Sequence, residues 1–287
     1  MTTPARRLWQ LAEPYHAVTY FAPEAHAAFE RAGLRGFWRG YFAGRAAPLG
    51  PVGAGVVTAS FFGFHPAFVG RAVPSIWSMT APVDAIAARL AGVDEALRRI
   101  FDGELPGTST GNAAALCRGA LEACDAAGRP LFAANLELDW PDEPHLALWH
   151  AVTLLREHRG DGHVAALTVA GVDPCEAHVT RVAASGASPD TIQPYRGWSG
   201  DDWTAATERL HAREWLDDDG RLTAAGQAGR EQVEHDTDRL AAEPVDRLGA
   251  DGLGAVLRTL APLTAGLVDT GLIPYPNPIG VPAPESR

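Results

Sequence analysis

The most constraining feature of this chain is an internal repeat, in which one sequence pattern occurs twice. Residues 15–19, Tyr-His-Ala-Val-Thr, return as Trp-His-Ala-Val-Thr at residues 149–153. Further matches follow in the same order, and their offset grows only from 134 to about 143 residues. Since each copy is as long as a typical domain, the repeat predicts two homologous domains, residues 1–142 and 143–287.

Composition is typical of a globular protein of the cytoplasm. Hydrophobic residues make up 46% of the chain and charged residues 21%, which is enough for a packed core. No run approaches the roughly 20 apolar residues of a membrane helix, and Met1–Arg7 lacks the apolar core of a signal peptide. Cys117, Cys124 and Cys175 are an odd number without metal-ligand spacing. We therefore expect a reducing compartment and no membrane partner.

The charge balance differs between the two copies and argues against nucleic acid as a partner. All basic side chains are arginines, and the chain has no lysine. Residues 1–142 carry 12 arginines against 13 acids, whereas residues 143–287 carry 12 against 22. Proteins that bind nucleic acid neutralise phosphates with a basic face. Neither copy has a basic run, so DNA and RNA are not expected partners.

The second copy has a clear helical pattern. Apolar residues at helical spacing predict a helix over residues 145–159, and Asp161 suits the N-cap of a separate short helix that ends near Ala170. Later helices are expected at 174–185, about 199–213, 224–242 and 253–268, after the helix starts Asp173-Pro174, Ser199 or Asp201, and Thr223. Residues 214–226 hold two strand-like pieces around an Asp-Gly turn, which predicts a β-hairpin.

This order of elements resembles that of MarR-type winged-helix repressors. The hairpin followed by Leu-Thr-Ala-Ala-Gly at residues 222–226 is the most specific match. The whole chain is also similar to the SalK-like group of actinobacterial helix-turn-helix-like proteins. Because MarR-type proteins are homodimers of subunits of about this length, the resemblance implies a fused pseudo-dimer, mainly α with small β wings. Such a chain is expected to be a monomer or a weak homodimer.

The segments that would read DNA depart from the repressor pattern. The expected recognition helix begins Asp201-Asp202-Trp203, and the wing tip is Asp217-Asp218-Asp219, whereas phosphate and base contacts need Arg, Lys, Asn or Gln. In the first copy, residues 56–69 are rich in phenylalanine, and the wing around residues 71–77 lacks an Asp-Gly turn. We therefore expect that DNA binding has been lost.

The polar residues of the first helix in each copy then become the candidate site. By analogy with the ligand sites of the repressors, we expect a cavity between the copies that holds a small organic molecule, such as an aromatic secondary metabolite. Histidines that titrate near neutral pH suit acid–base chemistry, and Arg159 suits a carboxylate or phenolate. The predicted catalytic residues are His16, His150 and His163, and the predicted binding residues are Tyr20, Glu24, His65, Trp77, Trp149, Glu157, His158, Arg159 and Asp161.

Each of these residues also has a structural explanation. Histidines on amphipathic helices are commonly satisfied core residues, and residues 156–163 also fit a solvated helix end. The chain has no P-loop, Gly-x-Gly-x-x-Gly, Gly-x-Ser-x-Gly or His-Glu-x-x-His motif. The sequence therefore leaves enzyme and binding protein open, assigns no cofactor, and predicts no metal site, although ten histidines are compatible with a metal or haem. Two alternatives are a MarR-like transcriptional regulator and a protein-interaction scaffold.

Overall fold

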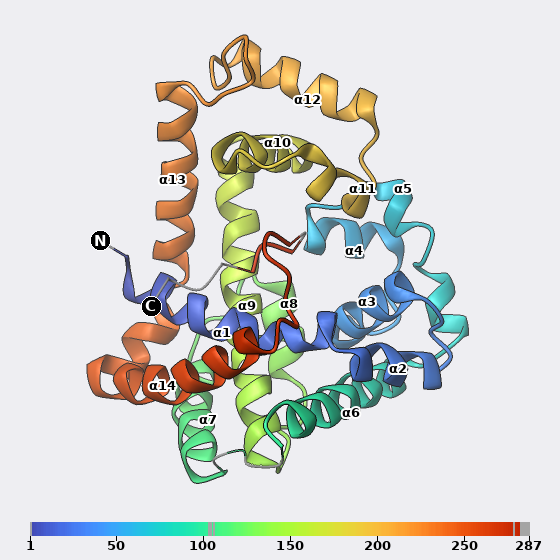
Figure 1. Ribbon diagram of the computed structural model, residues 1–287, viewed down its shortest axis with the longest axis vertical. Helices are drawn as coiled ribbons and strands as arrows, with labels where there is room; N and C mark the ends of the chain where they lie inside the picture. The colour runs from blue at the N-terminus through green and yellow to red at the C-terminus, as the bar shows by residue number, and fades with distance from the viewer. Residues whose placement is uncertain (1, 103–104, 106, 278, 282–287) are drawn as a thin grey trace.

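The computed structural model describes residues 2–102, 105, 107–277 and 279–281, and these residues form a helical protein (Figure 1). Long helices α9, α13 and α14 build one side, while α2–α6 build the other. None of the described helices is long and apolar enough to cross a lipid bilayer. The helices of the first half are α1 (Pro4–Phe21), α2 (Pro23–Arg31), α3 (Phe37–Ala46), η1 (Ala47–Leu49), α4 (Ala54–Phe61), α5 (Pro66–Val69), η2 (Ser75–Ser78), α6 (Pro82–Ile100), α7 (Gly107–Leu121) and α8 (Pro130–Leu136).

The second half follows the helical pattern of its sequence closely. The helix starts at Asp173-Pro174 and Thr223 are confirmed, and of the two predicted caps Ser199 and Asp201 it is Ser199 that caps α12. Asp173 and Glu176 form a reciprocal capping box at the start of α10. The final helix begins ten residues earlier than predicted and contains a break at Gly249. The helices of this half are α9 (Pro144–Val169), α10 (Pro174–Ser185), η3 (Pro189–Thr191), α11 (Gln193–Arg196), α12 (Gly200–Ala212), α13 (Ala224–Leu240) and α14 (Glu243–Asp269).

The predicted β wings are absent, so the expected fold class was wrong on this point, although "mainly α" was right. In the second half, one isolated bridge joins Leu216 to Leu222, and no strand forms among the described residues. The Asp-Gly turn does form, because the Asp217 carboxylate accepts hydrogen bonds from the amides of Asp219 and Arg221. The flanking pieces are too short for a stable two-stranded hairpin. In the first half, residues 71–77 form turns that lead into η2.

The predicted helix boundary at Asp161 was also wrong. α9 runs without interruption through Gly160, Asp161 and Gly162. Gly162 packs so closely on a neighbouring helix that an added Cβ would lie 3.0 Å from the Leu240 side chain. The Asp161 carboxylate accepts a hydrogen bond from the Phe132 amide of α8. Gly162 therefore marks close helix packing, and the polar segment around it lies in the middle of a buried helix.

The two halves interlock through one core rather than packing as separate bodies. This hydrophobic core contains buried residues of α1, α6 and α7 from the first half and of α9 and α14 from the second. Tyr15 donates a hydrogen bond to the His145 carbonyl, and Trp149, its counterpart in the repeat, donates one to the His16 carbonyl. The two donors occupy matching positions of the repeat, whereas the two acceptors do not, so the contact joins the halves without strict symmetry. The division into two homologous domains stays a prediction.

The segments aligned with DNA-reading elements touch each other directly. The carbonyl oxygen of Gly63, just after α4, accepts hydrogen bonds from His178 Nε2 of α10 at 2.8 Å and from Trp198 Nε1 at 3.1 Å. The amide of His65 donates to the Arg196 carbonyl at 2.9 Å. The first half is therefore bonded to the α10–α12 region of the second, away from the shared core.

Candidate functional site

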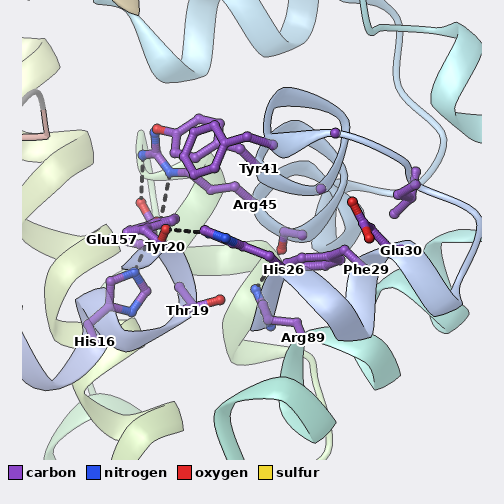
Figure 2. A pocket seen from close by; sticks show the side chains of 15 residues that line it. His16, Thr19, Tyr20, His26, Phe29, Glu30, Tyr41, Arg45, Arg89 and Glu157 are labelled. Atoms are coloured by element: carbon purple, nitrogen blue, oxygen red, sulfur yellow. Dashed lines mark hydrogen bonds and ion pairs between the residues drawn. The ribbon is translucent and has the colours of Figure 1, made fainter. Parts of the chain in front are cut away.

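Two cavities lie beside α3, and both are lined by Tyr41 and Arg45. The smaller cavity has a volume of about 150 Å³, and Tyr20, Phe29, Phe37 and Tyr41 form the aromatic part of its wall. Figure 2 shows Glu157 meeting Arg45, and Tyr20 next to His16, at one side of the cavity, while His26, Glu30 and Arg89 lie on other parts of its wall. Its lining residues come from α1, α2, α3, α6 and α9, together with the turn that precedes α3.

His16 sits in the smaller cavity as a fixed, neutral imidazole. The Thr153 hydroxyl donates its proton to the Trp149 carbonyl, so the His16 Nδ1–H must donate to Thr153 Oγ1 at 3.0 Å. His16 Nε2 then accepts from the Tyr20 hydroxyl at 3.0 Å. Burial and the charge of Arg156 hold the pKa of His16 well below its usual value. At neutral pH this histidine is therefore an acceptor and positions Tyr20.

Glu157 is a fully buried carboxylate at the wall of the smaller cavity. It accepts hydrogen bonds from Arg45 at 3.1 Å and from Arg156 at 2.7 Å, and only 1% of its surface is exposed. Burial alone would raise the pKa of Glu157, but the charges of Arg156 and Arg45 outweigh it and lower the pKa to about 2. Glu157 is thus ionised at neutral pH and balances part of a cationic cluster.

The larger cavity, about 260 Å³, lies between the two halves. Its walls are α3 and the end of α4 on one side, α9, α10, α11 and α13 on the other, with Ile279 of the C-terminal segment beside them. That segment runs back from α14 toward α4 (Figure 1), and the Asn277 carbonyl accepts a hydrogen bond from Arg181 at 3.0 Å. Five arginines line this cavity: Arg45, Arg156, Arg181, Arg196 and Arg230.

Two of these arginines, Arg181 and Arg230, form no ion pair with a carboxylate among the described residues. Burial, together with the charges of Arg196 and Arg230, lowers the pKa of Arg181 to about 10. Burial also lowers the pKa of Arg196 and of Arg230. Glu234 is the single carboxylate among the described residues that line this cavity, and it pairs with Arg6 at 2.6 Å and lies 3.7 Å from Arg159. The wall of the larger cavity therefore has an excess of positive charge.

Tyr41 joins the two cavities and responds to that charge. Burial would raise its pKa, but the nearby charges of Arg45, Arg196 and Arg156 lower it below its usual value. Tyr20, also buried, has its pKa raised, mainly by burial. Two phenols of one aromatic cluster, 5.2 Å apart between ring centroids, are thus driven in opposite directions by their distance from the arginines.

The structure separates the three predicted catalytic histidines. His163 lines the larger cavity, and its Nδ1–H donates to Thr237 Oγ1 at 2.8 Å, because that hydroxyl donates to the Val233 carbonyl. Burial lowers the pKa of His163. His150 lines neither cavity; it meets the Trp140 ring edge-on, and burial lowers its pKa to about 3. That pKa is far from the neutral range that suits an acid–base catalyst.

The predicted binding residues are spread over the molecule. Tyr20 and Glu157 line the smaller cavity, whereas Trp149 is fully buried in the shared core. Residues 156–163 are not a solvated helix end, because their carboxylates and His158 are buried. The other predicted binding residues lie outside both cavities. In the first half, Glu24 pairs with Arg99, His65 caps α5, and Trp77 donates a hydrogen bond to the Val52 carbonyl.

The remaining three lie on α9. His158 faces Phe132, and Arg159 pairs with Asp238. The Asp161 carboxylate accepts a hydrogen bond from the Phe132 amide, and burial is the main cause that raises the pKa of Asp161 to about 6.

Sequence reasoning missed the arginines that dominate the larger cavity. Arg45, Arg181 and Arg230 lie on three helices that are distant in sequence, so only the tertiary fold brings them together. One signal was present for Arg45, which stands alone in the apolar run from Tyr41 to Leu49. An isolated arginine in such a run is buried with its charge and must find a partner. Here that partner is Glu157.

Comparison with known proteins places the chain at the level of a family. No curated protein and no solved structure matched it. A profile described as a helix-turn-helix family matches residues 5–274. The helix-turn-helix relationship predicted from the sequence is confirmed, and the narrower likeness to MarR-type and SalK-like proteins stays a prediction. The chain belongs to this helix-turn-helix family.

Proposed function

We propose that this protein binds a small organic anion with an aromatic or apolar body in the larger cavity between its two halves. The observation that carries the proposal is the excess of arginine charge around that space. Arg181 and Arg230 form no ion pair with a carboxylate among the described residues, and each has its pKa lowered. A carboxylate or phenolate in the cavity would remove this repulsion and gain hydrogen bonds of about 1.5–3 kcal/mol each.

The apolar part of the ligand is suggested by the remaining wall of the same cavity. Phe61, Phe62 and Trp215 line it together with aliphatic side chains from α9 and α13. Arg196 lies over the Phe64 ring, 4.3 Å from its centroid, and Arg45 lies 4.2 Å from that of Phe61. A flat aromatic acid fits this combination of ring faces and guanidinium groups.

Binding is better supported than catalysis. His16 and His163 each use Nδ1–H to hold a threonine hydroxyl, and each has a lowered pKa, so both are neutral acceptors at pH 7. A neutral acceptor can orient a hydroxyl group of a ligand. Tyr41, with its lowered pKa, is the residue best placed to exchange a proton with a bound molecule.

The proposal predicts opposite effects of one substitution on binding and on stability. Arg230→Gln should weaken binding of benzoate or salicylate by about tenfold or more, since one charge-assisted hydrogen bond is lost. The free energy of unfolding of the ligand-free protein should not fall, because a repelling charge is removed. Titration calorimetry measures the affinity, and urea unfolding measures the stability.

Two controls separate this result from nonspecific effects. Arg221→Gln, on the exposed Asp-Gly turn where the arginine side chain is 74% exposed, should bind the anions as the unaltered protein does. Benzamide and benzyl alcohol keep the ring but lack the charge, so they should bind much more weakly. Equal binding of the charged and neutral compounds, or full affinity in Arg230→Gln, would contradict the proposal.

Sequence-specific DNA binding is a second candidate, favoured by the family match. The outward residues of α12 weigh against it. Arg209 pairs there with Asp173 and Glu176, and α4 exposes Gly55, Val56 and Ala59. Selection from a random DNA library at low salt tests this candidate: enrichment of one sequence would support it, and retention of none would remove it.

A further inference from the structure

A second cluster, outside both cavities, has the composition of a metal site. Cys124 follows α7, His158 lies in the middle of α9, and Glu243 is the first residue of α14. Their sulfur, nitrogen and oxygen atoms all lie within 4.8 Å of one another. Thiolate, imidazole and carboxylate are the three ligand types that Zn²⁺ prefers in proteins. No sequence motif indicates this cluster, because its three members are distant in the chain.

The buried imidazole of His158 is an independent indication of a ligand at this cluster. The side chain is fully buried, yet neither ring nitrogen has a hydrogen-bond partner among the described residues. Nε2 lies 3.9 Å from Glu243 Oε2, which is too far for a hydrogen bond. A buried polar group without a partner costs about 1–3 kcal/mol, so an imidazole left in this state requires an explanation.

The other two ligand atoms have long hydrogen bonds that a cation would replace: Cys124 Sγ donates to the Ala120 carbonyl at 3.3 Å, and Glu243 Oε2 accepts from the Asp125 amide at 3.3 Å. Arg247 holds Glu243 through Oε1, at 2.7 Å and 3.1 Å, and Oε2 is the oxygen nearer to His158. The ring of His158 meets Phe132 edge-on, which limits its tilt. Glu243 is about one-third exposed, so solvent reaches one side of the cluster.

We propose that Cys124, His158 and Glu243 bind one Zn²⁺ ion, with water from the open side as the fourth ligand. Tetrahedral coordination brings sulfur and nitrogen ligands to about 3.5 Å from each other, so the side chains must close by about 1 Å. The thiol of Cys124 loses its proton to solvent as the Zn–S bond forms, and the imidazole binds in its neutral form. The ion would join the first half, through Cys124, to α9 and α14 of the second.

Cobalt and zinc titrations of the full chain test this assignment. The protein should take up one equivalent of Co²⁺ with a thiolate-to-cobalt charge-transfer band in the near ultraviolet, and Zn²⁺ should displace it. Cys124→Ala should abolish that band. Glu243→Gln should weaken Co²⁺ binding by about 100-fold or more, since even outer-shell changes cost 10–100-fold. Cys175→Ala, which removes another buried thiol, should leave both the band and the affinity unchanged.

Three further outcomes decide the matter. Absence of a stoichiometric Co²⁺ or Zn²⁺ complex in the unaltered protein would overturn the proposal, as would a charge-transfer band that persists in Cys124→Ala. If Cys124→Ala fails to fold, the partly exposed Glu243→Gln variant provides the test, and its unaltered affinity would also overturn the site. These readouts do not depend on any organic ligand, so they are separate from the test of the larger cavity.

Discussion

At the scale of single residues, the cationic interior of this protein depends on a few buried carboxylates. Glu157 faces Arg45 and Arg156, whose side chains are 11% and 15% exposed. Taking such ions out of water costs several kcal/mol each, and their mutual attraction offsets that cost only while all partners are present. The loss of the carboxylate therefore matters more than the net strength of the pair.

Glu157→Gln should destabilise the protein by about 3–5 kcal/mol at pH 7, because it leaves the buried Arg45 without its carboxylate and Arg156 with Glu13 as its remaining partner. The pKa of Glu157 falls from its usual 4.5 to about 2 on folding. The stabilising effect of ionised Glu157 is therefore complete above pH 4.5 and is lost as the pH falls toward 2. Urea unfolding at pH 7, 4 and 3 should show the difference between the two proteins shrinking with acidity.

Glu122→Gln is the matched control for this prediction. Glu122 pairs with Arg118 on the surface of α7, where both side chains are about half exposed, so its loss should cost less than about 1 kcal/mol. A Glu157→Gln variant as stable as Glu122→Gln would show that the buried pair does not hold the cationic cluster together.

The sequence located the polar segment at residues 156–163 but not its environment. A high density of charged residues in a sequence does not distinguish a solvated helix end from a buried ion-pair network, since both contain Arg, Glu and His. Gly160 and Gly162 suggested a chain break, whereas Gly162 serves the close contact with Leu240. Whether the segment is a solvated helix end or a buried network depends on α13, which packs on α9 and comes about 60 residues later in the chain.

At the scale of elements, α13 packs very closely on the turn before it. An added Cβ at Gly226 would lie 2.1 Å from the Trp215 carbonyl oxygen, and one at Gly229 would lie 2.3 Å from the Trp215 ring. Both glycines face the same tryptophan, one turn apart, so the helix lies directly against it. These are positions where only glycine fits.

Gly229→Ala should therefore destabilise the protein by about 1–3 kcal/mol, although alanine is the better helix former. Gly119→Ala is the control, because an added Cβ on that exposed face of α7 meets nothing within 4 Å. It should raise the free energy of unfolding by about 0.5–1 kcal/mol. Thermal and urea unfolding of both variants measure the two signs, and a stabilising Gly229→Ala would contradict the packing described for Trp215.

Elements were predictable from sequence where local chemistry decides them. Asp173, Ser199 and Thr223 cap their helices through hydrogen bonds to backbone amides within three residues, so the signal and its cause lie together. A strand instead needs a partner of sufficient length. The wing sequence held a turn signal, but its flanks supply only one bridge.

At the scale of the whole molecule, the two halves complete each other's core. α1 packs on α14, and α7 packs on α9, so each half contributes a helix to the other. Tyr15 and Trp149, at matching positions of the repeat, are both fully buried by this exchange. The repeat does not specify the cavities, because their walls depend on side chains that differ between the copies.

A chain divided after residue 142 should fold only when both parts are present. Residues 1–142 or 143–287 alone would expose the apolar face that the other part covers, so neither should show the full helicity or a cooperative unfolding transition. Co-expressed parts should copurify in a one-to-one ratio, as measured by size-exclusion chromatography with light scattering and by circular dichroism. A monomeric, cooperatively unfolding fragment of residues 1–142 would contradict this account.

The bonds at Gly63 and His65 have a consequence for geometry. Dimeric helix-turn-helix proteins bind DNA half-sites that lie about one turn of the double helix, 34–36 Å, apart. Here His178, Trp198 and the Arg196 carbonyl bond one head segment directly to the other. Any change in the distance between α4 and α12 would therefore have to break or carry along these bonds.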